Sequence, residues 1–546
     1  MKKIVLLFTA LFALTLFSCS NASGGGGGGG EPAVSDWLFL LYMDGDDSSI
    51  NDDLYENMRE VEYALAQIRN ADGSPKEGYP SIRVVALWDG ISEELKAAQK
   101  YIHSDGALYE LGPDYDLQWI YYSNLDPNYV GTVGKVCLVK EADGTYSLGP
   151  TFKMSVKTKD LTSTAGAWLE KEPKMGEQAT FEGFLKWAKA RYSAKNVVVC
   201  LSDHGAGTHK ETYSDSNATS KSICADTTSG DNKLLTCKNI KDALTNAGYT
   251  GANKPKILWH DVCFQSTAEI IYNFKGCADY YSASPNESVS NNFVRIFTSI
   301  KSGHTAVDVG KIIASSFHEY KAAFNENFNA FKNCLSSGSS MFTWSFFSLD
   351  ETKVEALKTA VDNFATAMHT IYGNPPDDHT LFNSVYTKYV KQDKTDLSKC
   401  MGLAYGGTYA FLNDLGYLAK QVKNDPDLSA AHESAQALLD LLKHGDDKLI
   451  IYAWGGKRAQ TATSSDSGWS NVTTNQMYLT GQKDFITGKS VTVENGFDDD
   501  IYGMTIVASQ RNANVADDAV SNYYDWTGFS EEWGRVIKTW LETPGL

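Results

Sequence analysis

Cysteine and positive charge are both scarce in this 546-residue chain. Its nine cysteines include no C-x-x-C pair and no dense framework, which argues against a zinc ribbon and a disulfide-stapled scaffold. Lysine and arginine number 49 against 67 aspartates and glutamates. The resulting net charge of −18 disfavours a nucleic-acid partner, because phosphate binding needs clustered cations. The sequence also lacks an H-E-x-x-H motif and a histidine and cysteine cluster at ligand spacing, so no metal site is predicted from these patterns.

Long apolar runs are absent after the N-terminus, so the sequence predicts no transmembrane helix there. Residues 1–18 combine a basic start with an apolar core and are typical of a secretory signal peptide. Leu16-Phe17-Ser18-Cys19 resembles the bacterial lipobox, which implies that Cys19 is lipidated and becomes the mature N-terminus. Residues 19–34, with seven consecutive glycines, would then form a flexible tether. The alternative is an ordinary signal peptide cut near Ala22.

The rest of the chain has the composition of a folded globular protein, with 21% charged and 12% aromatic residues. Short apolar runs that stop at polar residues predict buried strands at 38–43, 83–88, 197–202, 256–261, 280–283, 449–452 and 502–507. Apolar residues at helical spacing predict helices ending near 69 and spanning 180–191, 234–249, 266–274, 354–371, 412–422, 432–442 and 526–541. Strands alternating with helices predict a doubly wound α/β sheet.

Two of the predicted strands end in groups that can do chemistry. The first ends at Asp203-His204-Gly205 and the second at Asp261-Val262-Cys263, with one amphipathic helix between them. Such a βαβ unit makes the two strands parallel, and open α/β sheets bind ligands at the carboxyl ends of their strands. We therefore expect His204 and Cys263 to emerge side by side at one edge of the sheet.

A thiolate beside a histidine is the arrangement needed for nucleophilic catalysis, because the histidine stabilises the thiolate and can protonate the leaving group. The backbone N–H groups of Gly205 and Cys263 would form an oxyanion hole. We further expect Cys263 to open the following helix, whose N-terminus would lower the pKa of the thiol. The plain alternative is a buried cysteine and a structural histidine.

The order strand-His-Gly, then strand-Asp-x-Cys, resembles the clostripain family of cysteine peptidases, relatives of caspases, gingipains and legumain. Further segments resemble the family at 37–46, 87–89, 175–189, 224–231, 278–285, 502–506 and 523–524. The resemblance implies a caspase-haemoglobinase-like α/β three-layer sandwich with a mostly parallel central sheet, and a C-terminal α-rich extension. It also implies a peptidase core at 35–330 and a mixed α/β region at 331–546 that completes or flanks this core.

The same resemblance implies a role for individual residues. His204 would be the acid/base and Cys263 the nucleophile, while Asp261 would line the pocket for a substrate Lys or Arg. A second acidic pocket residue is expected near Asn291-Asn292, where this chain has amides, and Glu287 could substitute for it. We therefore expect cleavage after Lys or Arg with relaxed specificity. In relatives, the exposed loop after the histidine is cut by the enzyme itself, and Lys210 and Lys221 are the candidate positions here.

The preferred interpretation is a cell-envelope cysteine endopeptidase that is lipid-anchored on the periplasmic or outer-membrane face of a bacterium. It would act on protein or peptide substrates through a thioester acyl-enzyme. The sequence requires no cofactor, although the resemblance implies Ca²⁺ as an optional one. The acidic turn of Asp44, Asp46 and Asp47 could hold that ion, but a solvated turn is the preferred interpretation. Two alternatives stay open: a lipid-anchored binding or adhesion protein on a decayed peptidase scaffold, and a metal-dependent hydrolase.

Overall fold

The computed structural model has one compact unit at Val34–Leu546. The structure describes residues 34–46, 50–90, 103–113, 139–140, 146–147, 157–205, 222–225, 233–285, 291–323, 341–372, 385, 412–458, 476–478, 502–508 and 523–542. None of the described helices is long and apolar enough to cross a lipid bilayer. The predicted signal peptide, Cys19 and nearly all of the tether lie outside the described residues.

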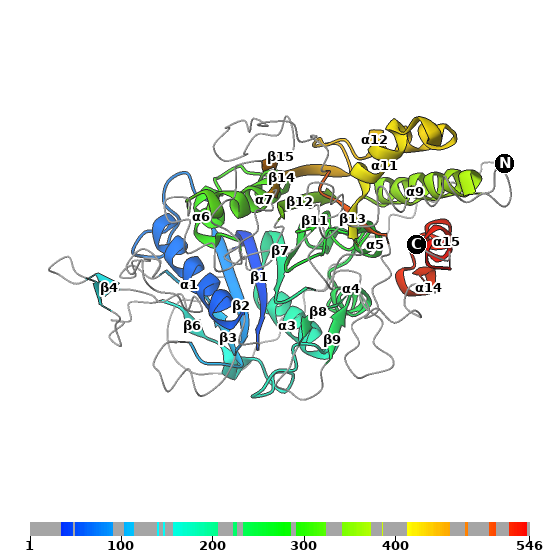
Figure 1. Ribbon diagram of the computed structural model, residues 1–546. Coiled ribbons are helices and arrows are strands. Elements are labelled where there is room, and N and C mark those ends of the chain that lie inside the picture. Colours follow the sequence, from blue (N-terminus) through cyan, green and yellow to red (C-terminus); the bar gives the residue numbers. More distant parts are fainter. Residues whose placement is uncertain are drawn as a thin grey trace, which may run out of the picture. The chain divides into compact units, whose positions relative to one another are not determined.

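A ten-stranded sheet forms the centre of the compact unit (Figure 1), in the order β15-β14-β12-β11-β10-β7-β1-β2-β3-β6. Its strands are β1 Ser35–Gly45, β2 Ile82–Gly90, β3 Ala107–Glu110, β6 Lys159–Asp160, β7 Ala194–Ser202, β10 Ile257–Asp261, β11 Tyr280–Ala283, β12 Met341–Ser348, β14 Ile450–Arg458 and β15 Gln476–Tyr478. The five central strands β2, β1, β7, β10 and β11 are parallel to one another, and antiparallel strands continue the sheet from β2 and from β11. The predicted α/β class with a mostly parallel centre is confirmed.

The parallel strands read as continuous apolar runs because helices cover both faces of the sheet. Along β1, Trp37, Phe39 and Leu41 enter one core, whereas Leu38 and Leu40 enter the other. Because side chains of a strand alternate between the two faces, one strand supplies both cores. Because both faces of these strands are buried, their register is fixed, and so is the position of their ends. The candidate site lies at these ends.

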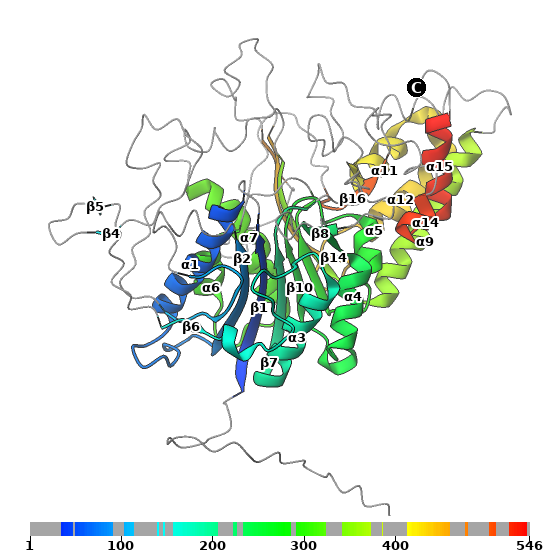
Figure 2. The same ribbon diagram turned by 90° about the horizontal axis from the view of Figure 1, so that it is seen from below.

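Helices form the two outer layers (Figure 2). One face is covered by α1 Asn51–Ile68, α6 Phe293–Ser299 and α7 Ala306–Ala323. The other is covered by α3 Gln178–Arg191, α4 Cys237–Asn246, α5 Ala268–Asn273 and α9 Glu351–Tyr372. Two further helices, α12 His432–Leu441 and α15 Glu531–Glu542, pack on α9. Helix α11 Leu415–Asn424 packs on α12, and α14 Tyr523–Thr527 contacts α15. The result is a three-layer sandwich with additional helices at one end.

The described residues also form three two-stranded sheets. They pair β4 Val139–Lys140 with β5 Tyr146–Ser147, β8 Ser222–Ala225 with β9 Leu234–Thr236, and β13 Leu412–Asp414 with β16 Thr505–Val507. The predicted boundary between residues 330 and 331 lies outside the described residues. Strands from both sides of that boundary, β11 and β12, are hydrogen-bonded neighbours in the main sheet.

Most predicted elements are present, but three predicted helices have different starts or an interruption. The helix predicted for 234–249 begins only at Cys237, because Leu234–Thr236 pairs with β8, and Thr236 caps the helix through a capping box. The helix predicted for 412–422 likewise starts after strand β13, at Leu415. The last predicted helix is divided into α14 and α15 around Gly528, which has a positive φ of 61°.

Candidate active site

The candidate catalytic pair lies beyond the ends of two adjacent parallel strands. In the register of β7 and β10, Ser202 is the partner of Asp261. His204 and Cys263 each follow two residues later, so both leave the sheet at the same edge, as predicted. The side chain of His204 is exposed and that of Cys263 is half-buried. Both groups are therefore placed at the surface, where a substrate can approach them.

Direct backbone contact between the two turns fixes their spacing. A Cβ atom added to Gly205 would collide with the carbonyl oxygen of Cys263 and would lie 2.8 Å from its amide nitrogen. Only glycine allows this approach. Gly205 also bridges Ile223 of β8, so the segment after residues 206–221 returns to the same point. The two proposed oxyanion-hole residues are thus neighbours in space.

The turn that carries Cys263 is held from behind by backbone groups. Phe264 has a positive φ of 59°, an unusual conformation for a residue with a side chain. Ser266 donates its hydroxyl to the carbonyl oxygen of Ala283 at 2.7 Å, and the Thr505 N–H donates to the Ser266 carbonyl at 2.9 Å. The strained turn is therefore tied both to β11 and to strand β16 near the C-terminus.

The prediction that Cys263 opens a helix is wrong. Helix α5 begins only at Ala268, and its N-cap is Thr267, whose hydroxyl accepts from the Ile270 N–H. The intervening residues form the strained turn, so the start of α5 is displaced from the thiol by several residues. Because the influence of a helix terminus fades within one turn, this start of α5 does not support the expected effect of the helix on the thiol.

His260 is fully buried and packs behind the same turn. Its Nδ1 lies 2.9 Å from the hydroxyl of Tyr281, which donates its hydrogen to the Gln265 carbonyl at 3.0 Å. This assignment places the imidazole hydrogen on Nδ1, which donates to the Tyr281 oxygen. Complete burial lowers the pKa of His260 to about 3, so the ring is neutral. His260 thus belongs to the packing behind the turn.

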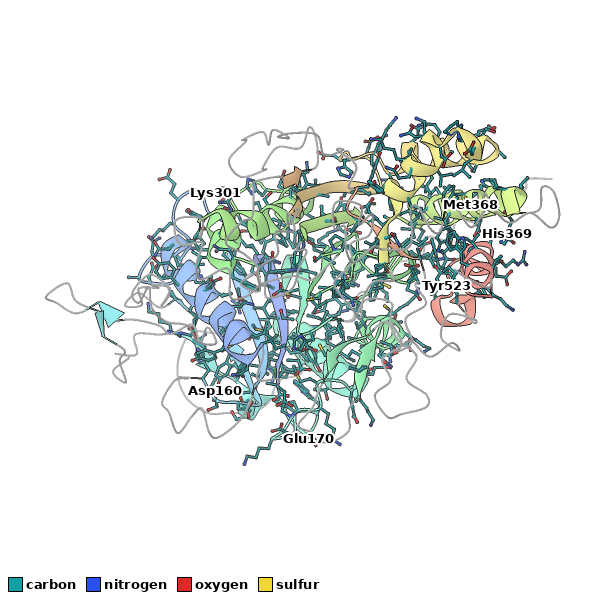
Figure 3. All side chains as sticks on the ribbon, in the orientation of Figure 1. Asp160, Glu170, Lys301, Met368, His369 and Tyr523 are labelled. Carbon is teal, nitrogen blue, oxygen red and sulfur yellow. The ribbon has the colours of Figure 1, made fainter. Side chains whose placement is uncertain are left out.

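Helix α5 is anchored to the C-terminal region by a buried glutamate. Glu269 accepts hydrogen bonds through Oε1 from the Val507 N–H at 3.0 Å and from the Tyr523 hydroxyl at 2.7 Å. Figure 3 shows Tyr523 among the C-terminal helices, close to α9. Burial raises the pKa of Glu269. Strand β16 and helix α14 therefore contact α5, the first helix after the candidate nucleophile.

Asp261 and Asn291, both predicted to line a substrate pocket, are in contact. Asn291 donates its side-chain amide to Asp261 Oδ1, and Ser202 donates its hydroxyl to Oδ2, each at 3.3 Å. Burial raises the pKa of Asp261 to about 7, and the nearby charge of Glu60 adds to this shift. Glu60 is buried on α1 and accepts from the Phe293 N–H at 2.8 Å. Sequence reasoning missed Glu60.

The acidic turn at the end of β1 is buried, whereas the sequence predicted a solvated turn. Asp44 and Asp46 are only 1% and 3% exposed. Asp44, Asp203 and Cys224 each place one potential ligand atom within 4.8 Å of the others. The edge of the sheet next to His204 is therefore a buried acidic environment. Four other predicted residues lie outside the described residues: Asp47, Lys210, Lys221 and Glu287.

Comparisons with known proteins agree with the sequence-based resemblance. The sequence matches the model of the clostripain family, peptidase family C11, over residues 143–540. Among solved structures it is similar to a secreted C11 cysteine protease from Bacteroides thetaiotaomicron in complex with an irreversible peptide inhibitor. That match has 12% identity, covers 90% of this chain and 98% of the other, and has a TM-score of 0.48. An inactive zymogen C11 protease from Parabacteroides distasonis matches at 14% identity over 91% and 98%, with a TM-score of 0.45. No curated protein matches the sequence.

Proposed function

Because the chain belongs to the clostripain family of cysteine peptidases, we propose that His204 and Cys263 form its catalytic dyad and cleave peptide bonds. The observation that carries the proposal is the contact between the Gly205 and Cys263 backbones at adjacent strand ends. Cys263 attacks the scissile carbonyl, the tetrahedral oxyanion accepts hydrogen bonds from two backbone N–H groups, and His204 protonates the departing amine. Water then hydrolyses the resulting thioester and releases the acid and the thiol.

An electrophilic peptide probe tests this function. We expect a peptide with a C-terminal acyloxymethyl ketone to alkylate Cys263, whose sulfur displaces the carboxylate leaving group. The peptide that contains Cys263 should gain the mass of the probe minus that of the released carboxylic acid. A protein that uses the scaffold only for binding would show no adduct at Cys263 under the same conditions. A metal-dependent hydrolase would lose activity with a chelator and keep it after thiol alkylation.

The preferred substrates would carry Lys or Arg before the scissile bond, with relaxed selectivity. Asp261 would supply the carboxylate that pairs with the substrate cation, and Asn291 would supply only a dipole next to it. Because a buried cation needs a charge partner, one carboxylate gives weaker discrimination than two. The raised pKa of Asp261 adds a pH dependence, since only the ionised carboxylate, favoured above about pH 7, attracts the cation.

We expect Asn291→Asp to raise the ratio of kcat/KM for matched Arg and Gln substrates by roughly 10- to 100-fold, equivalent to about 1–3 kcal/mol. In the parent enzyme kcat/KM for the Arg substrate should rise as the pH passes about 7, while that for the Gln substrate should not follow this ionisation. Asn292→Asp is the matched control. Its side chain caps α6 by accepting from the Arg295 N–H, and aspartate caps equally well. An unchanged Arg preference in Asn291→Asp would contradict this pocket assignment.

Maturation by self-cleavage is proposed for residues 206–221. Gly205 and Ile223, which bracket this segment, bridge each other beside the candidate nucleophile. Cleavage after Lys210 or Lys221 would leave both new ends near the site, and exposed loops are preferred positions of nicking. The Lys210→Ala, Lys221→Ala double variant should stay a single chain on a denaturing gel. The Cys263→Ala variant should also stay a single chain if the enzyme cuts itself. It should still be cut if another peptidase cleaves it in trans.

A lipid anchor at Cys19 and a location in the cell envelope are also proposed, on the basis of the lipobox-like Leu16–Cys19 and the glycine-rich stretch that follows. Several acyl chains on one cysteine would hold the enzyme at a membrane, whereas a single chain binds only marginally. Cys19→Ser should release the protein from the membrane fraction. Retention of the serine variant in that fraction would contradict the anchor.

A further inference from the structure

Residues 502–504 lead into β16, which ties the candidate nucleophile to the C-terminal region. Strand β16 pairs with β13 and lies beside α5 (Figure 2). The N–H of Thr505, the first residue of β16, donates to the Ser266 carbonyl at 2.9 Å, at the end of the Cys263 turn (residues 263–266). The position of this turn therefore depends in part on the contacts that hold residues 502–504.

A buried carboxylate holds this segment. Asp414 lies at the end of β13, and its Oδ2 accepts from the N–H groups of Tyr502 at 3.0 Å and Gly503 at 2.9 Å. Its Oδ1 accepts from the Tyr417 N–H at 2.9 Å and so caps helix α11. Burial raises the pKa of Asp414 to about 7, against the opposing effect of these N–H groups, so the carboxylate is mostly ionised above that pH. One oxygen therefore caps a helix, and the other holds the segment before β16.

The backbone of this segment is shaped for an anion. Gly503 has a positive φ of 83°, which lets the N–H groups of two successive residues converge on one oxygen. The Gly503 carbonyl accepts from the Ser345 hydroxyl of β12 at 2.7 Å. The Tyr502 ring lies against Gly416, where an added Cβ atom would collide with it. The segment is thus held from β12, β13 and α11 together, and the two hydrogen bonds to Asp414 are the ones that charge strengthens.

We propose that Asp414 is a positioning residue for peptide hydrolysis, because its carboxylate holds the segment that ties the Cys263 turn to β16. The inference rests on the proposed role of Cys263 as the nucleophile. Without the second oxygen of Asp414, two backbone N–H groups would lose a charged acceptor, and the segment would shift to replace it. Thr505 and Ser266 would pass that shift to the Cys263 turn. A nucleophile displaced by about 1 Å acylates more slowly, while the substrate pocket still binds.

Asp414→Ser separates the two tasks of the carboxylate. Serine is a good N-cap, so its hydroxyl can still accept from the Tyr417 N–H, but it offers no second oxygen to Tyr502 and Gly503. Assayed above about pH 7, this variant should have a kcat roughly 10- to 100-fold lower than the parent and a KM close to the parent value. Alkylation of Cys263 by the peptide acyloxymethyl ketone should slow by a similar factor.

Hydrogen–deuterium exchange measures the tie itself, without hydrolysis. In Asp414→Ser we expect faster exchange of the backbone amides of β16 and of residues 263–266 than in the parent. Asp425→Ser is the matched control, because Asp425 lies at the opposite end of α11 and is also a buried cap, which accepts from the Asp427 N–H at 3.0 Å. This control should keep the parent kinetics and the parent exchange in β16.

Ser345→Ala reaches the same segment from β12 and keeps the inference testable even if Asp414→Ser fails to fold. It removes the hydroxyl that donates to the Gly503 carbonyl, so alkylation of Cys263 should slow in this variant as well. Parent-like alkylation in every folded variant of the segment would overturn the inference, as would equal losses in Asp414→Ser and Asp425→Ser. A parent that gives no Cys263 adduct would refute the proposed function, and exchange in β16 would then decide whether Asp414 holds the turn.

Discussion

Cys263→Ala should abolish peptide hydrolysis, and His204→Ala should do the same, with losses in kcat on the order of 10⁴- to 10⁶-fold. Neither substitution should unfold the protein. His204 is exposed and Cys263 is half-buried, so alanine creates little cavity at either position. If the two side chains act on the same step, as proposed, the double variant should be hardly less active than either single variant. Single-turnover hydrolysis of a fluorogenic peptide, with Tm as the folding control, measures the effect.

Cys277 is the matched control for this experiment. It is also half-buried and packs against the same core, but its position between α5 and β11 is remote from the edge that carries His204. Burial raises the pKa of this thiol, so it is a poor nucleophile. Cys277→Ala should therefore keep full activity. Substantial activity in Cys263→Ala, with none in Cys277→Ala, would refute the assignment of the nucleophile.

Gly205→Ala should reduce kcat/KM by on the order of 10²-fold, although His204 and Cys263 are both retained. The new methyl group would collide with backbone atoms of Cys263, which cannot rotate away as the end of a flexible side chain can. The turn with His204 must then move relative to the nucleophile, and a displacement of about 1 Å typically costs this much in rate. Steady-state kinetics together with probe labelling of Cys263 would show slower acylation in a folded protein.

Gly303→Ala is the control for Gly205→Ala. Gly303 has a φ of 88°, so alanine is strained there, but a Cβ atom would have no neighbour within 4 Å. This variant should lose some stability and keep the parent kcat/KM. If both glycine variants lose activity in proportion to their loss of stability, the contact between Gly205 and Cys263 has no special role in positioning.

The central strands and the meeting of two strand ends could be predicted because local sequence determines both. Apolar runs such as 38–43 and 83–88 can only be buried, and one crossover helix makes 197–202 and 256–261 parallel neighbours. The start of α5 could not be predicted in this way. The residues from Cys263 to Ser266 have acceptable helical propensity, but contacts with Ala283 and Thr505 hold them in a turn. Those partners are distant in sequence.

Buried carboxylates were the main failure of pattern reasoning. Glu60 lies between the inward-facing residues Met58 and Val61 on α1. Because it is charged, the pattern of an amphipathic helix predicts that it faces solvent. The structure buries it because the Phe293 N–H at the start of α6 provides a partner. Asp44 and Asp89 likewise fit the pattern of a solvated strand end. In the structure they are partners in the register of β1 and β2, and both are buried. Burial of this kind depends on tertiary contacts that spacing does not encode.

The hydrogen bond from Thr505 to Ser266 also has a consequence for the time course of biosynthesis. A chain is made from its N-terminus, so His204 and Cys263 emerge long before strand β16 does. Until Thr505 arrives, the carbonyl of Ser266 lacks this donor, so the Cys263 turn lacks its tie to β16. Pairing across such a sequence separation is intrinsically slow. The nascent chain should therefore carry its nucleophile in an unfinished turn, and hydrolytic competence should appear only at the end of synthesis and folding.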